Sequence, residues 1–226
     1  MHHAKVRAVF SPRASASTRR DRMALPPATP DRQPKHRRGI DVQVFARADG
    51  LWEVDARLTD TKSQDCVLAS GIRPAGSPVH DMLLRLVVDD RLVILEAGAS
   101  ALAMPYPGLC DAYGDAYGRL VGLSLLRGFR RAVLERLGGV RGCTHVTELA
   151  QVLPTAVIQA LAGEVIDTQE GRPNPDRPGS ELPPFQIDRC HALRRDAEAV
   201  RLYYPRWYRA TPEHNPQGPA GGESSA

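Results

Sequence analysis

Apolar residues alternate with polar ones in two runs near the start of the regular part of the chain. They occupy every second position of 40–46 and again of 52–58. Strict alternation is typical of strands with one buried face. Asp49-Gly50 lies between the runs, and this dipeptide favours the tight turn of a β-hairpin. The pattern therefore predicts two antiparallel strands joined by a short turn.

Two further apolar runs follow after a polar segment that contains Gly and Pro. The segment covers about 60–78 and is expected to be a loop. The runs cover 82–88 and 92–97, and Asp89-Asp90 separates them. Together with the first hairpin they predict an antiparallel sheet of about four strands.

The apolar spacing then changes to three and four residues. Helical spacing covers 113–137 and then 143–162, where Pro154 is expected to kink or divide the second helix. A last ordered piece is expected at 185–209. Strands followed by helices are typical of the α+β class, so we expect one α+β domain over 39–209.

Both ends of the chain lack this periodicity. Residues 1–38 are rich in Arg, Pro, Ala and Ser, and residues 210–226 are rich in Pro, Gly and Ser. Segments of such composition cannot bury enough apolar surface to order themselves. We therefore expect a disordered basic arm at 1–38 and a disordered tail at 210–226.

The formal net charge of +4 is close to that of many nucleic-acid-binding proteins, but its distribution argues against that class. Much of the basic excess lies before residue 40, and residues 1–36 have one aromatic residue, Phe10, on which a base could stack. No apolar segment reaches about 18 residues, and no apolar signal region follows the first residues. We expect a cytoplasmic protein with no nucleic-acid or membrane partner and with a small-molecule substrate.

The densest group of reactive side chains is Cys143, His145 and Glu148, just after a Gly-Gly break. If a helix begins near Thr144, His145 and Glu148 share a face, and Cys143 lies where the helix dipole favours a thiolate. Such groups bind metals or move protons. The ordinary alternative is a buried thiol, a polar residue at a helix start and a surface carboxylate.

Three more residues are candidates for the same site. Cys110 precedes the first predicted helix as Cys143 precedes the second, His80 begins the third predicted strand, and Cys190 lies beside His191. Each also has an ordinary interpretation, as a core thiol, a solvated strand start or a surface cysteine. The metal ligands that we predict are His80, Cys110, Cys143, His145 and Cys190. Zinc suits this ligand set best, and iron is the alternative.

Three classes of function are consistent with these residues. A metal with three protein ligands and water suits hydrolytic or lyase chemistry on a small molecule, with Glu148 near the metal or acting as general base. A metal-free enzyme would use Cys143 as nucleophile and His145 or His80 as base. A non-enzymatic accessory protein would hold an iron–sulfur cluster on its thiols during cofactor assembly.

The order of several short strings resembles a bacterial family known as domain of unknown function 2889. The resemblance covers roughly 37–208, implies no activity and makes residues 1–36 an extension. A more distant likeness to iron–sulfur scaffold proteins rests on a sheet followed by helices and on three separated cysteines. The strings that resemble the family are His80-Asp81-Met82, Pro107-Gly108-Leu109-Cys110, Leu120-Val121-Gly122, Gly128-Phe129, Gly138-Gly139, Gly142-Cys143-Thr144-His145, Asp188-Arg189-Cys190 and Tyr204-Pro205-Arg206-Trp207.

Overall fold

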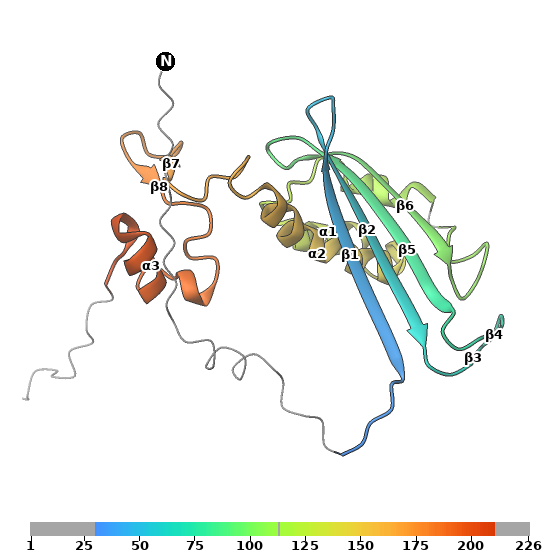
Figure 1. Ribbon diagram of the computed structural model, residues 1–226. Coiled ribbons are helices and arrows are strands. Elements are labelled where there is room, and N and C mark those ends of the chain that lie inside the picture. The colour runs from blue at the N-terminus through green and yellow to red at the C-terminus, as the bar shows by residue number, and fades with distance from the viewer. Residues whose placement is uncertain (1–29, 113, 211–226) are drawn as a thin grey trace, which may run out of the picture. The chain divides into compact units, whose positions relative to one another are not determined.

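Four long strands form one antiparallel sheet in the computed structural model of the chain, which describes residues 30–112 and 114–210 (Figure 1). Gly50 has a left-handed φ of 81°, which suits the turn between the first two strands. The sheet and the α+β class confirm the prediction. The strands, in the order β1-β2-β5-β6, are β1 (His36–Ala46), β2 (Trp52–Lys62), β5 (Pro78–Val88) and β6 (Ile94–Ala103).

The predicted loop at 60–78 contains a small hairpin. Its strands are β3 (Cys66–Leu68) and β4 (Gly71–Arg73). The Ser70 hydroxyl donates to the Pro105 carbonyl, and Arg73 Nη2 donates to the Met104 carbonyl over 3.0 Å. These bonds hold the hairpin against the loop after β6. Both lie at the end of the sheet where β2 ends and β5 begins.

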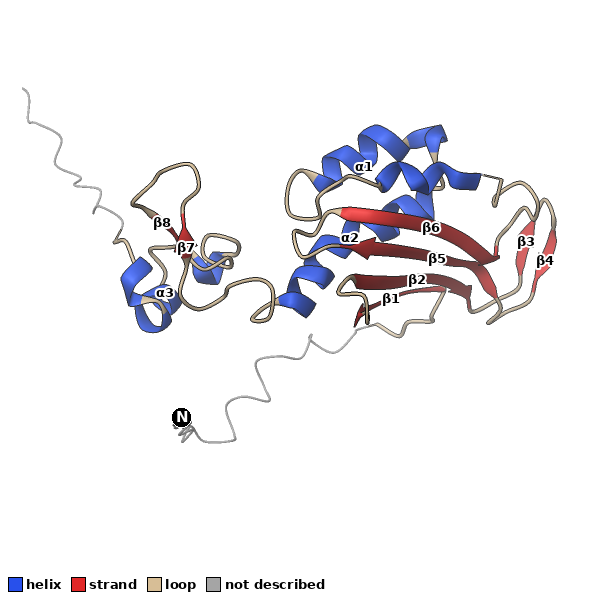
Figure 2. Cartoon of the chain, turned by 90° about the horizontal axis from the view of Figure 1, so that it is seen from above, coloured by secondary structure: helices blue, strands red, loops and turns tan. Residues whose placement is uncertain are grey.

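Helices cover one face of the sheet (Figure 2). They are η1 (Gly114–Leu120), α1 (Phe129–Leu137), η2 (Gly139–Arg141) and α2 (Thr144–Leu161), where η denotes a 3₁₀ helix. The prediction of α2 is confirmed in its extent.

One of the helix predictions is wrong. A single helix over 113–137 does not form, because Gly122 and Gly128 have left-handed φ angles of 82° and 63° and Ser124 bridges to Val93. Of the two outcomes expected at Pro154, division of the helix does not occur, since α2 continues through it to Leu161, and a kink stays a prediction.

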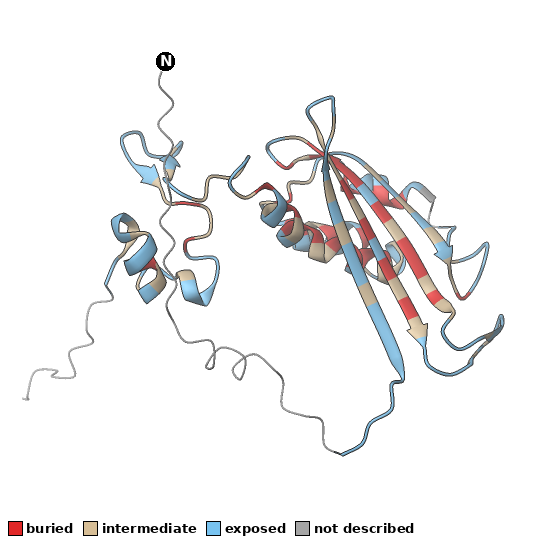
Figure 3. Cartoon of the chain, viewed as in Figure 1, coloured by how far each residue is buried: buried red, intermediate tan, exposed pale blue. Residues whose placement is uncertain are grey.

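Alternate residues of the two central strands form the core (Figure 3). The even-numbered residues 54–60 of β2 and 82–88 of β5 point toward the helices and are buried, as the period of two requires. Apolar side chains of α1 and α2 pack against them. The largest fully buried side chains are Tyr117, Leu58, Met82, Leu84, Leu86, Leu92, Ile94, Leu120, Leu137, Leu149, Leu153 and Leu161.

The opposite face of the sheet carries charged side chains and lines an open hollow of about 880 Å³. Arg57 forms two hydrogen bonds with the buried carboxylate of Asp81, at 2.7 and 2.6 Å. Arg85 pairs with Asp55 in the same bidentate way. The two faces therefore differ in chemistry, and the helix-covered face holds the core.

The predicted ends are only partly described. β1 begins at His36, three residues before the predicted start of the domain at 39, because His36 and Arg38 bind a side chain of β2. Most of the predicted arm and nearly all of the predicted tail lie outside the described residues. Within the described ranges, no helix has the length and apolar character needed to cross a membrane.

The chain after α2 forms short elements, which fall within the ordered piece expected at 185–209 or just before it. They are β7 (Arg172–Pro173), β8 (Glu181–Leu182), η3 (His191–Leu193), α3 (Glu198–Tyr203) and η4 (Pro205–Trp207).

Candidate metal centre

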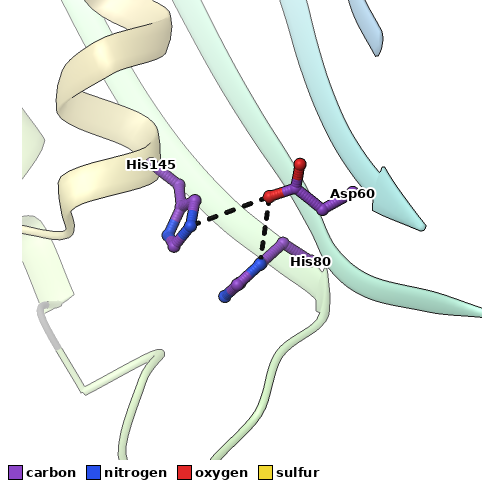
Figure 4. Close-up of side chains that lie close together, drawn as sticks. All are labelled: Asp60, His80 and His145. Carbon is purple, nitrogen blue, oxygen red and sulfur yellow. Dashed lines mark hydrogen bonds and ion pairs between the residues drawn. The ribbon is translucent and has the colours of Figure 1, made fainter. Parts of the chain in front are cut away.

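Three elements bring Asp60, His80 and His145 together (Figure 4). Asp60 lies near the end of β2 directly opposite His80 of β5, and His145 lies in the first turn of α2. Asp60 Oδ2 is 3.1 Å from His80 Nδ1 and 3.7 Å from His145 Nε2. Their ligand atoms all lie within 4.8 Å of one another, and no other such group of His, Cys, Asp or Glu occurs among the described residues.

The strand pattern places Asp60 and His80 on the helix-covered face. Both have even numbers, so they continue the rows of Val54, Ala56 and Leu58 in β2 and of the matching residues in β5. Asp60 is only 3% exposed. A buried carboxylate needs partners, since an isolated charge in the core is costly.

Asp60 has such partners on both oxygens. Its Oδ1 lies 2.8 Å from His36 Nε2 and accepts from Arg38 Nε at 2.8 Å, and its Oδ2 accepts from Arg38 Nη2 at 2.7 Å. Burial opposes ionisation, but the hydrogen bonds from Arg38 and His36 outweigh it and lower the pKa of Asp60 to about 2. Asp60 is therefore a carboxylate across the physiological range.

The two histidines of the cluster stack on each other. Their ring centroids are 3.6 Å apart and their planes differ by 29°. Burial lowers the pKa of His80, and the charge of His145 lowers it further. Burial also lowers the pKa of His145. Both rings are therefore neutral near pH 7, and a neutral imidazole is the form that binds a metal or accepts a proton.

Tyr117 fixes the start of α2 next to the cluster. Its hydroxyl accepts from the Cys143 N–H at 3.1 Å and donates to the Cys143 carbonyl at 2.9 Å. The chain passes so close here that a Cβ on Gly142 would lie 2.9 Å from the Leu137 carbonyl oxygen. The side chain of Cys143 makes no capping hydrogen bond, and its Sγ lies 3.9 Å from His145 Nδ1.

A family model described as "Protein of unknown function (DUF2889)" matches residues 36–159. The chain belongs to this family. The DUF2889 segment runs from the first residue of β1 almost to the end of α2, so it contains the sheet, Asp60, His80 and His145. No curated protein and no solved structure matches the chain.

The DUF2889 segment ends earlier than the sequence resemblance suggested, which extended to about 208. Cys190 lies beyond it. Cys190 is exposed and precedes η3, and Cys110 is half-buried in the loop before η1. No contact between described residues joins the side chain of either cysteine to Asp60 or the two histidines. Their roles as ligands, and the iron–sulfur hypothesis that needs both, stay predictions.

Of the other predicted site residues, His80 and His145 come together, and Cys143 contacts His145. Glu148 contacts the cluster indirectly, through Arg38: Arg38 binds Asp60, and its Nη1 donates to Glu148 Oε2 at 2.5 Å. Sequence reasoning missed Asp60, together with His36 and Arg38. Asp60 falls at the start of the segment predicted as a loop, two residues after the predicted strand pattern ends at 58, and the structure extends β2 through it to Lys62.

Proposed function

We propose that this DUF2889 protein binds a divalent transition metal, with zinc first and iron second, through Asp60, His80 and His145. The observation that carries the proposal is the convergence of one carboxylate and two neutral imidazoles from three separate elements. Two histidines and a carboxylate are a ligand set for catalytic zinc and for non-haem iron.

The spacing of the ligand atoms suits one ion. Two ligands that bind a metal at about 2.1 Å in tetrahedral geometry lie about 3.4 Å from each other. The two distances from Asp60 Oδ2, 3.1 and 3.7 Å, bracket that value. His80 would bind through Nδ1, which faces Asp60, and its one ring proton would then lie on Nε2.

The charges around the site also favour a cation. Arg38 brings one positive charge, and the carboxylates of Asp60 and Glu148 bring two negative ones. Glu148 thus offsets the guanidinium that holds Asp60. Hydrogen bonds to the second oxygen of a ligating carboxylate are common around metal sites, where they fix its orientation.

We place the chemistry in the hydrolase or lyase class on a small molecule. A bound zinc polarises a carbonyl and lowers the pKa of a coordinated water to near 7. Three protein ligands leave a position open for that water or for substrate. Glu148, whose side chain is 47% exposed, is the carboxylate available to accept a proton there.

An equilibrium titration against a chromophoric zinc chelator tests the proposal. We expect the wild type to bind about one zinc per chain, and His80→Ala and His145→Ala each to weaken binding by at least about tenfold. Cys66→Ala is the matched control, because it removes a cysteine from the β3–β4 hairpin and should leave affinity unchanged. Binding of less than about 0.2 equivalents of zinc by the wild type, with no difference from the variants, would contradict the proposed metal site.

One observation supports a second candidate, a metal-free enzyme with Cys143 as nucleophile. His145 lies between Cys143 and Asp60, with Nδ1 facing Sγ and Nε2 facing Oδ2. This is the order of nucleophile, base and orienting carboxylate in a catalytic triad. Rates of thiol alkylation distinguish the candidates: His145→Ala slows alkylation of Cys143 at pH 7 if His145 is its base, and His80→Ala leaves the rate unchanged.

A further inference from the structure

The imidazole of His145 faces two different partners. Cys143 Sγ is 3.9 Å from its Nδ1, and Asp60 Oδ2 is 3.7 Å from its Nε2. A neutral imidazole carries one proton, so one nitrogen donates and the other offers a lone pair. Which nitrogen holds the proton therefore decides whether His145 presents a lone pair to Asp60 and a metal, or to the thiol.

Cys143 and Asp60 face different nitrogens of this ring, so a metal held by Asp60 and His145 would be on the Nε2 side. The lone pair of Nε2 points away from Nδ1, and a metal shared with Asp60 has to lie along it. A sulfur that contacts Nδ1 cannot reach the same ion without rotation of the ring. Cys143 is therefore placed to contact the ligand His145. The sequence, by contrast, predicts that Cys143 itself binds the metal.

We infer that Cys143 is a positioning residue, whose sulfur accepts a hydrogen bond from His145 Nδ1–H and so fixes the tautomer with a free lone pair on Nε2. The inference rests on the proposed metal site. Partners on the second nitrogen of a ligating histidine are a regular feature of metal sites, because they fix the tautomer and the ring orientation.

The backbone around Cys143 supports this role. Tyr117 binds both the N–H and the carbonyl of Cys143, so the position of its Cα is fixed relative to α2. Its side chain caps no backbone group of the helix. The buried phenol therefore fixes the backbone from which the sulfur reaches the His145 ring, and the sulfur does not cap the helix.

Nuclear magnetic resonance of ¹⁵N-labelled wild-type protein tests the inference directly. Multiple-bond ¹H–¹⁵N correlations distinguish the two tautomers, and a His145→Gln sample assigns the ring. We expect the Nδ1–H tautomer in the metal-free and the zinc-loaded protein. The Nε2–H tautomer in metal-free protein would overturn the inference, whether or not zinc binds, and would favour the nucleophile candidate.

Cobalt substitution supplies a second readout, which distinguishes a cysteine that binds the metal from one that contacts a ligating histidine. We expect no thiolate-to-cobalt charge-transfer absorption in the wild type, and the same visible spectrum in Cys143→Ala. The zinc dissociation constant of Cys143→Ala should rise about tenfold, as for other losses beside a ligating histidine, and that of Cys66→Ala should not change. A charge-transfer band lost in Cys143→Ala would make Cys143 a ligand and contradict the inference while leaving the metal site intact.

Discussion

The two faces of the sheet each hold a buried carboxylate paired with an arginine, and the difference between them is instructive. Asp60 on the helix-covered face and Asp81 on the open face are 3% and 5% exposed. Both accept two hydrogen bonds from one guanidinium. Asp81 has Arg57 as its side-chain partner, whereas Asp60 also contacts three histidines. The three imidazoles distinguish Asp60 from Asp81, and two of them belong to the proposed metal site.

The largest expected effect comes from removing each carboxylate. Asp60→Ala leaves Arg38 and the half-buried His80 without their acceptor, so we expect a loss of about 3 kcal/mol in the free energy of unfolding, and loss of zinc binding. Asp81→Ala should cost less, because water solvates the exposed Arg57, and should leave zinc binding unchanged. Urea unfolding and zinc titration of both variants measure this. Equal effects of the two variants on zinc binding would contradict the claim that the two faces of the sheet differ in metal binding.

The acid limb of stability should depend on Asp60. Its folded pKa, about 2, is below the unfolded value, so the carboxylate stabilises the fold above about pH 4, and this stability is lost as pH falls toward 2. The shift corresponds to at most about 2 kcal/mol. The free energy of unfolding can be measured with urea between pH 5 and 2, about the range over which Asp60 takes up its proton. We expect it to depend less steeply on pH in Asp60→Asn than in the wild type. An unchanged slope in that variant would argue against the lowered pKa.

The two stacked histidines should contribute a separate dependence nearer neutrality. Their folded pKa values are lowered by burial, so the unfolded chain binds protons first as pH falls. Stability is full above the unfolded value, about 6.5, and declines as pH falls through the folded values. The melting temperature across this range should depend less steeply on pH in the double variant His80→Gln/His145→Gln than in the wild type. The opposite sign, with stability rising on acidification, would mean that the pair gains a proton on folding.

Glu148 should give the smallest effect on stability. Its pair with Arg38 is largely exposed, so Glu148→Gln should change the free energy of unfolding by less than about 0.5 kcal/mol. Zinc binding should weaken measurably, because the charge that offsets Arg38 is lost. Glu135→Gln is the matched control, since it removes another exposed carboxylate that pairs with an arginine. Equal zinc affinities in the two variants would remove Glu148 from the account.

Much of the fold follows from local pattern, and the limits of that approach are physical. Alternation predicted the first two strands, and short apolar runs between turn residues predicted the other two. Local pattern failed at 113–137, where apolar spacing looks helical but glycines at 122 and 128 turn the chain. Composition also extended the predicted arm to 38, whereas residues 36–38 pair with residues 60–62 of β2, which are distant in sequence.

The candidate site was half predictable for the same reason. His145 and Cys143 are neighbours in sequence, so their proximity could be inferred, and His80 was expected at a strand start. Asp60 depends on the register that places it opposite His80, which no single segment of sequence contains. Cys110 was grouped with them because it precedes a predicted helix, as Cys143 does, and Cys190 because it lies beside His191; both stay predictions, since position along a chain does not establish that side chains converge.

The central claim is that the helix-covered face binds a metal and the open face does not. Metal content after loading with zinc and desalting tests it most directly, measured by inductively coupled plasma mass spectrometry on wild type, Asp60→Ala and Asp81→Ala. The account predicts about one zinc per chain in the wild type and in Asp81→Ala, and less than about 0.2 in Asp60→Ala. Equal zinc content in all three proteins, whether high or near zero, would contradict it.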